Sequence, residues 1–268
     1  MKKWSLVALV SFTIISCSQY QKVLKSDNYD LKIEEADRQY EAKKYSRAYN
    51  LYDQIFTKER WNQKHQDINY RYGKSMYLTE KYQLSGIFFT SYNLNFVNSP
   101  YQEEAYFLEA MSEYHLTDVS SKDQQRTKSA ITKFEKYFEK FPNGEKKEEA
   151  TKYYLELKRK LEKKAFDNAQ LYNKIGEYTR DYNAAIVALD NFMLDNPGSI
   201  YKEDALFYKF DSAYKLAINS VYSKMEERIN NAISSYNTLI AFNENSKYKA
   251  KADAMLATLN KELQQFSK

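Results

Sequence analysis

The chain has 268 residues, of which 43% are hydrophobic and 29% charged, and its formal net charge is +5. Only five glycines and three prolines occur, which favours long helices joined by short turns and argues against a sheet protein, since sheets need more turn residues. Acidic and basic residues are interspersed, and the charge falls to +3 without Lys2 and Lys3. This balance argues against a nucleic-acid partner.

Residues 1–16 have the pattern of a signal peptide. A basic start precedes Trp4–Ile15, an almost uncharged apolar run that is too short to span a bilayer as a helix. Small Ser16 then stands before Cys17, the only cysteine. This boundary resembles the bacterial lipobox. The resemblance implies cleavage before Cys17 and acylation of that residue with N-acyl and S-diacylglycerol groups, which would anchor it firmly. The alternative is an ordinary secretory peptide that contains a cysteine.

Residues 17–30 are polar, and we expect them to form a lipidated tether that holds the folded part off the membrane. Helical periodicity follows, and residues 31–144 are expected to form three helix-turn-helix repeats, with a polar loop inserted at 116–126. The same layout returns after 37 residues, with Ala36, Tyr40, Ala48 and Tyr52 in the first repeat, Gly73, Tyr77, Ser85 and Phe89 in the second, and Ala110 and Tyr114 opening the third.

The second helix of the third repeat carries the motif that is most clearly reused. Ala130, Phe134 and Tyr137 share one helical face, and Pro142 ends the helix before an Asn-Gly turn. The motif returns at Ala185, Leu189, Phe192 and Pro197, and without the proline at Ala232, Tyr236 and Leu239. The reuse of one amphipathic helix predicts a repeat protein.

Residues 145–268 are expected to form a long connecting helix, repeats four and five, and a cap. The stretch 145–175 contains no Pro or Gly and has apolar residues at helical spacing, which predicts one helix of about 30 residues. Apolar residues at helical spacing over 246–266 predict a terminal capping helix, which stacked repeats need for solubility.

A repeated unit with a small residue in each helix is the tetratricopeptide pattern. The expected fold is therefore an all-α solenoid of about five helix-turn-helix units with a C-terminal capping helix. Such units behind a lipobox resemble the BamD family of outer-membrane assembly lipoproteins. The match is best over 130–145, 150–165 and 182–197, and it covers nearly the whole chain after residue 16. Glu244 departs from it by replacing the motif's proline.

The resemblance implies a non-enzymatic scaffold that is lipid-anchored in the outer membrane and faces the periplasm. It implies that residues 31–144 face a substrate, the C-terminal targeting strand of unfolded outer-membrane β-barrel proteins. Residues 145–268 would face the periplasmic domains of the BamA insertase, and other assembly lipoproteins are possible further partners. Two alternatives stay open, namely another periplasmic tetratricopeptide lipoprotein that organises cell-envelope or glycan-handling proteins, and an all-helical enzyme.

The repeat phase nominates residues for a peptide-binding groove. The first helix of each unit is expected to face inward, where exposed aromatic rings can receive an extended peptide with aromatic side chains at alternate positions. The candidate groove residues are Asp37, Tyr40, Tyr70, Lys74, Tyr77, Phe107, Met111 and Tyr114. The spacing leaves open whether Tyr40, Tyr77 and Tyr114 contact a ligand or pack between helices.

The sequence contains no pattern that indicates catalysis. His65 and His115 each lack a second histidine or cysteine at ligand spacing, so no metal site is expected. The glycines are too scattered for a phosphate-binding loop, and no serine stands in a nucleophile elbow. We expect no catalytic residue, no nucleic-acid partner, and no cofactor apart from the acyl groups on Cys17.

Overall fold

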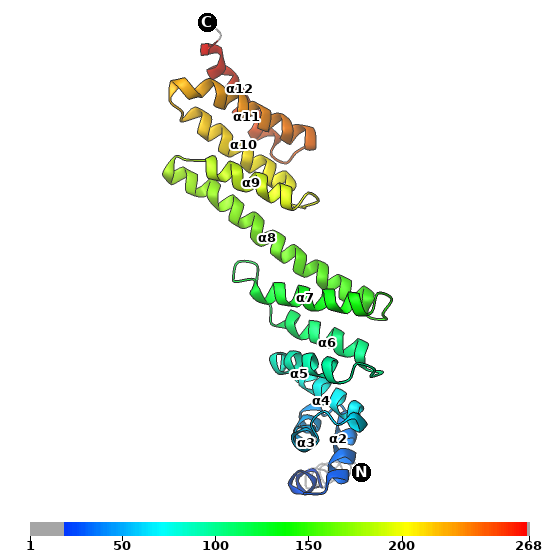
Figure 1. Cartoon of the computed structure of the whole chain (residues 1–268). Coiled ribbons are helices and arrows are strands. Elements are labelled where there is room, and N and C mark those ends of the chain that lie inside the picture. The colour runs from blue at the N-terminus through cyan, green and yellow to red at the C-terminus, as the bar shows by residue number, and fades with distance from the viewer. Residues whose placement is uncertain (1–18, 267–268) are drawn as a thin grey trace, which may run out of the picture. The chain divides into compact units, whose positions relative to one another are not determined.

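The computed structural model describes residues 19–266, and every regular element in that range is a helix (Figure 1). A short helix at residues 19–25 comes first. The longer helices are α2 Tyr29–Glu41, α3 Tyr45–Lys58, α4 Gln66–Leu78, α5 Tyr82–Asn95, α6 Gln102–His115, α7 Gln125–Lys140, α8 Lys147–Thr179, α9 Asn183–Asp195, α10 Lys202–Ile218, α11 Tyr222–Phe242 and α12 Lys249–Leu263. The all-α prediction is confirmed.

The chain divides into two compact units, and the boundary between Lys158 and Arg159 lies inside α8. The boundary predicted from the sequence lies earlier, between residues 144 and 145. The difference arises because the first part of α8 packs on unit 1, where the Tyr153 ring lies 4.7 Å from that of Tyr114 in α6. The ring of Tyr154, in the same part of α8, lies 5.6 Å from that of Phe138 in α7. Unit 1 therefore ends within α8, at Lys158.

Unit 1 consists of three helical hairpins, in which α2 packs on α3, α4 on α5, and α6 on α7. Small residues at the same position of the second helices (Ala48, Ser85 and Ala130) are fully buried, which lets the paired helices approach closely. The residues four and seven positions later fill the space between the helices, and all are at most 1% exposed: Tyr52, Ile55, Phe89, Tyr92, Phe134 and Tyr137. This burial confirms the repeat register, and the hairpins are of tetratricopeptide type.

The expectation of a polar tether over 17–30 is wrong for the described residues 19–30. Tyr20 is buried, and its hydroxyl donates a hydrogen bond to the Arg47 carbonyl at 3.3 Å. The Arg47 guanidinium covers the Tyr20 ring at 5.1 Å. Tyr29 donates to the Ile55 carbonyl at 2.6 Å. The N-terminal segment therefore packs against α3, because its few apolar side chains share one face of a short helix.

Unit 2 repeats the same packing. Helix α10 packs on α9 and α11, and α12 packs on α11 and α10. The reused motif is again buried, at Ala185, Leu189, Phe192, Ala232 and Leu239. Helix α12 buries Ala252, Met255 and Leu259, whereas its exposed positions carry only Lys, Ala and Asn. It therefore closes the core of unit 2 with a largely polar outer face, as a capping helix must.

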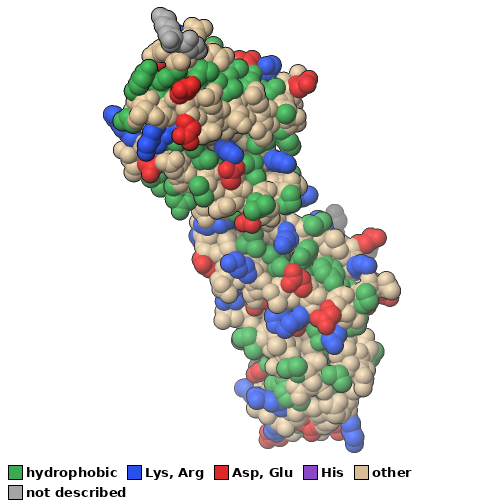
Figure 2. Space-filling model, turned by 45° about the horizontal axis from the view of Figure 1, so that its top comes forward, with side chains coloured by type: hydrophobic (Ala, Val, Ile, Leu, Met, Phe, Trp, Pro, Cys, Tyr) green, Lys and Arg blue, Asp and Glu red, His purple; other side chains and the backbone are tan. Residues whose placement is uncertain are grey.

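Charged side chains of both signs are interspersed on the face shown in Figure 2. Among residues 19–266, no helix combines the length and the hydropathy that a membrane span needs.

Candidate functional site

The first helices of the unit 1 hairpins, α2, α4 and α6, carry most of the candidate residues, and consecutive ones are in contact. Tyr40, Tyr77 and Tyr114 occupy the same position in these three helices, 37 residues apart, and each is half-buried. Their side chains and the polar groups beside them form a row along unit 1, which we call the tyrosine row. It continues to Tyr153 in the first part of α8.

The α2–α4 end of the tyrosine row is built around Asp37. Tyr52 donates a hydrogen bond to Asp37 Oδ1 at 2.6 Å, and Arg71 Nη1 lies 3.0 Å from the same oxygen. The Arg71 guanidinium also lies 5.5 Å from the centre of the Tyr40 ring, within the range of a cation–π contact. Burial raises the pKa of Tyr52, and its hydrogen bond to Asp37 raises it further, so its hydroxyl stays protonated and remains a donor.

The α4–α6 junction holds a second polar group. Lys74 Nζ donates to Glu104 Oε1 at 2.7 Å and to the Tyr70 hydroxyl at 3.0 Å, and Tyr70 itself donates to Glu104. Burial alone would raise the pKa of Glu104, but the hydrogen bonds from Lys74 and Tyr70 outweigh it and hold that pKa below its usual value. Glu104 is therefore an anion at neutral pH, and it ties α6 to α4.

An aromatic cluster lies further along the tyrosine row. The Tyr82 and His115 rings are stacked with centres 4.2 Å apart, and the Tyr77 hydroxyl lies 3.0 Å from His115 Nε2. Burial raises the pKa of Tyr77 to about 12 and lowers the pKa of His115. At neutral pH, His115 is therefore an uncharged ring that presents an aromatic face.

Tyr114 connects the row to α8. Its ring lies 4.7 Å from that of Tyr153, and its hydroxyl donates to Glu156 Oε1 at 2.8 Å. Burial, followed by the hydrogen bond to Glu156, raises the pKa of Tyr114 to about 12. The row thus offers half-exposed rings beside carboxylates and paired cations, an arrangement suited to binding side chains.

The structure separates the predicted groove residues into two classes. Asp37, Tyr40, Lys74, Tyr77 and Tyr114 are half-buried, so part of each side chain is accessible. Tyr70, Phe107 and Met111 are buried, so the prediction that they line an accessible groove is wrong for those three. Cys17 lies outside the described residues.

Sequence reasoning missed several members of the tyrosine row, namely Arg71, Tyr82, Glu104, His115, Tyr153 and Glu156. Some indication of Glu104 and Arg71 was present in the sequence, because they stand on the same helices as predicted groove residues. Their partners lie about 30 residues away along the chain, and spacing within one helix does not reveal such pairs.

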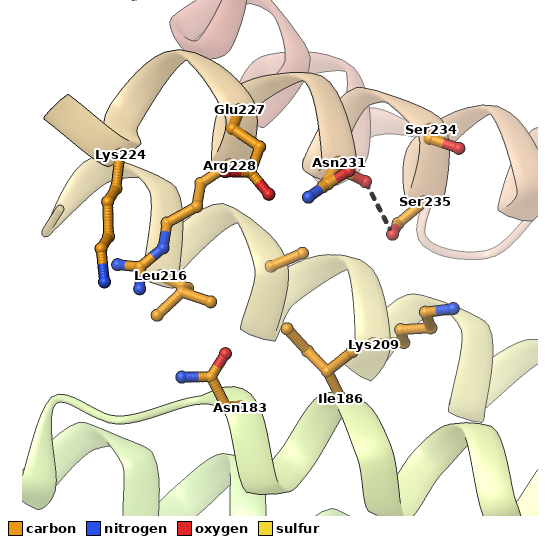
Figure 3. Close-up of a pocket in the computed structure, with 11 residues that line it drawn as sticks. Asn183, Ile186, Lys209, Leu216, Lys224, Glu227, Arg228, Asn231, Ser234 and Ser235 are labelled. Carbon is orange, nitrogen blue, oxygen red and sulfur yellow. Dashed lines mark hydrogen bonds between the residues drawn. The ribbon is translucent and has the colours of Figure 1, made fainter.

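Unit 2 has a cleft of about 540 Å³ between α9, α10 and α11 (Figure 3). Ile186 and Leu216 supply apolar wall, and Lys224 and Arg228 extend from α11 toward α10. Arg228 donates to Ser220 Oγ at 2.7 Å. The remaining lining residues are Asn183, Lys209, Ala213, Glu227, Asn231, Ser234 and Ser235. The cleft combines a partly apolar surface with polar groups.

Within residues 19–266, no group of three His, Cys, Asp or Glu residues is placed to hold a metal ion. His65 lies beside Glu59, with 3.4 Å between His65 Nδ1 and Glu59 Oε2, and His115 belongs to the aromatic cluster.

Comparisons with known proteins point to one family. The model of the YfiO family, described as "Outer membrane lipoprotein", matches residues 27–180 and 178–266. Among solved structures, the chain is similar to the P58(IPK) TPR domain, with 12% identity, a TM-score of 0.41, and coverage of 96% of this chain and 69% of the other. It is also similar to the TPR2AB domain of yeast Sti1 in complex with pHSP90, with 12% identity, a TM-score of 0.41, and coverage of 87% and 98%. No curated protein sequence matches the chain at a significant level.

Proposed function

The chain belongs to the YfiO family of outer membrane lipoproteins, and from that membership we propose that it is a non-enzymatic scaffold of the outer-membrane β-barrel assembly complex. In this proposal, Cys17 carries the acyl anchor, and the folded part faces the periplasm. Unit 1 binds the targeting strand of unfolded outer-membrane β-barrel proteins, and unit 2 binds the periplasmic domains of BamA.

The tyrosine row is the observation that carries the substrate part of the proposal. Tyr40, Tyr77 and Tyr114 repeat on the first helices of three successive hairpins, which contact one another in turn, and packed helices lie about 8–10 Å apart. Side chains on one face of an extended peptide recur about every 7 Å. Rings on the first helices of successive hairpins can therefore meet rings on one face of a peptide in edge contacts, which aromatic pairs prefer. Such binding needs no catalytic group.

An exposed apolar stripe on unit 2 supports the partner part of the proposal. Leu171, Ile175 and Tyr178 follow one another at helical spacing on the second part of α8, and Tyr178 is 89% exposed. Large apolar side chains grouped on the surface of a soluble domain mark interaction sites. A folded periplasmic domain is a suitable partner, because it can cover the stripe.

Affinity purification of the acylated protein from membranes tests the partner assignment. The wild-type protein should recover BamA, and the double variant Ile175→Asp/Tyr178→Asp should not. Leu94→Asp is the matched control, since Leu94 is an exposed apolar residue on unit 1, and it should retain BamA. Depletion should lower the level of outer-membrane β-barrel proteins. Unchanged levels, with cell-envelope or glycan-handling enzymes recovered in place of BamA, would favour the alternative scaffold.

Peptide binding tests the tyrosine row. A synthetic C-terminal strand of a β-barrel protein, with aromatic residues at alternate positions, should bind the wild-type chain. The double variant Tyr77→Ser/Tyr114→Ser should weaken binding about 5- to 150-fold, because each ring contact contributes about 0.5–1.5 kcal/mol. Tyr222→Ser in unit 2 removes a ring that is 66% exposed and should leave binding unchanged. Equal affinities for all three proteins would exclude the row as the binding site.

Acylation is tested by replacing the cysteine. Cys17→Ser should leave a protein that takes up no acyl label and no longer fractionates with the outer membrane. Unchanged outer-membrane fractionation of this variant would exclude the lipid anchor.

A further inference from the structure

The first residues that the structure describes lie at one corner of unit 1. Tyr20 packs beside Arg47, which lies in the first turn of α3. The preceding turn between α2 and α3 includes Lys43 and Lys44, so it lies at the same corner. Tyr20 follows Cys17 by three positions in the sequence, and a chain of that length spans at most about 11 Å. Covalent connectivity therefore keeps this corner close to Cys17.

The corner is basic. Lys43, Lys44 and Arg47 line a concave surface of about 550 Å³ together with the next hairpin turn, at Leu78–Glu80. Glu80 is the one carboxylate among its lining residues. Lys43 and Lys44 are exposed, and within residues 19–266 no ion pair is seen for either of them.

The backbone holds the basic side chains outward. Lys43 has a φ of 57°, and Glu80 in the next turn has a φ of 59°. Both turns therefore reverse the chain with a residue in the left-handed conformation. Lys43 N donates to the Tyr40 carbonyl at 2.9 Å and Lys44 N to the Gln39 carbonyl at 2.8 Å. The two lysines therefore project from a turn whose backbone is hydrogen-bonded, not from a free loop.

We propose that Lys43, Lys44 and Arg47, which we call the basic corner, bind anionic phospholipid headgroups of the membrane in which Cys17 is anchored. This inference rests on the acylation of Cys17 in the proposed function, because the acyl chains bring residue 17 to the headgroup layer. Tyr20 then lies at most about 11 Å from the anchored residue. This is close to the Debye length of about 8–10 Å, so charges at this corner are only partly screened from the headgroups. Charge complementarity with the anionic surface orients unit 1 with its α2–α3 turn toward the lipid.

Vesicle binding by the non-acylated chain isolates this contact. The protein from residue 17 onward, with Cys17→Ser, is sedimented with phosphatidylcholine vesicles and with vesicles that contain 30% phosphatidylglycerol. It should bind only the anionic vesicles, and binding should fall as salt is raised. Each lysine near an anionic surface contributes about a fivefold increase in binding, so Lys43→Gln/Lys44→Gln should weaken binding about 30-fold. Arg47 is left unchanged because it covers Tyr20.

Lys128→Gln/Lys136→Gln is the matched control. Both residues are exposed on α7, and the variant loses the same charge from unit 1. It should weaken vesicle binding much less than the roughly 30-fold loss expected for Lys43→Gln/Lys44→Gln. Equal losses of vesicle binding in the two double variants would refute the proposal that the basic corner binds anionic lipid. Equal binding of the chain to both kinds of vesicle would refute it as well. Stronger displacement by inorganic phosphate than by chloride at matched ionic strength would show a free-phosphate site and would also overturn it.

The acylation of Cys17 and the lipid binding of the basic corner can be refuted independently. A missing acyl label on the wild-type protein would refute the anchor, whereas vesicle binding by the Cys17→Ser chain does not depend on acylation.

Discussion

The packing around Gly73 predicts that Gly73→Ala destabilises unit 1. An ideal Cβ at this position would lie 2.7 Å from Phe88 Cδ1 and 2.9 Å from Phe89 Cζ. Both rings are buried, and Phe88 is held by edge contacts with Phe56 and Tyr72, so it has little room to move. Helix propensity favours Ala over Gly by about 1 kcal/mol, whereas overpacking costs about 1–3 kcal/mol. Because two contacts would fall below 3 Å, we expect a net loss of about 1–2 kcal/mol in the free energy of unfolding.

Trp61 fluorescence provides the assay. Trp61 is the only tryptophan after residue 16, and its ring centre lies 5.1 Å from that of Phe88. The urea midpoint of the non-acylated chain should fall by about 0.5–1 M, given an m value of about 2 kcal/mol/M. Gly198→Ala is the control, since nothing lies within 4 Å of its ideal Cβ. A midpoint that does not fall in Gly73→Ala, or one that falls equally in Gly198→Ala, would refute the reasoning.

Three further predictions concern unit 1. Ala130→Leu overpacks a fully buried position of α7 and should cost about 1–3 kcal/mol; an unchanged Trp61 midpoint would contradict close packing of α6 and α7 at this position. Lys133→Met should cost about 3 kcal/mol or more, because it leaves the buried Glu109 carboxylate without its cation, and a loss below 1 kcal/mol in the same assay would contradict this. Because burial lowers the pKa of His115, its contribution to stability is present above the unfolded pKa of about 6.5 and is lost as pH falls toward the folded pKa. NMR titration should find that pKa below 6.5 and find it raised in Tyr82→Ala, whereas no change in Tyr82→Ala would show that the stacked ring does not set it.

The hairpin core could be predicted from sequence because its signal is local. Ala130, Phe134 and Tyr137 are spaced so that they must share one helical face, and all three are completely buried. The same spacing located the cores of the other hairpins, including Ala185 and Leu189 in unit 2. The long helix α8 was also expected, since the absence of Pro and Gly over its first 29 residues is a local property.

The candidate site was predictable only in part, because exposure depends on neighbouring hairpins. Phe107 and Tyr114 stand on the same helix, yet Phe107 is buried against Tyr137 while Tyr114 is half-exposed. Helical spacing shows which residues share a face, but it does not show which neighbour covers that face. The tether was mispredicted for a related reason. The segment at Tyr20 is mostly polar, and its one buried ring becomes apparent only through contact with Arg47.

The polar pairs between successive hairpins have a consequence for the order of the repeats. Arg71 of the second hairpin pairs with Asp37 of the first, and Tyr70 of the second donates to Glu104 of the third. Each junction therefore uses its own donor and acceptor, although the buried cores of the hairpins are alike. Exchanging two hairpins would preserve apolar packing but leave partly buried polar groups unpaired, at about 1–3 kcal/mol for each group. The hairpins of unit 1 are thus similar in architecture but not interchangeable in sequence order.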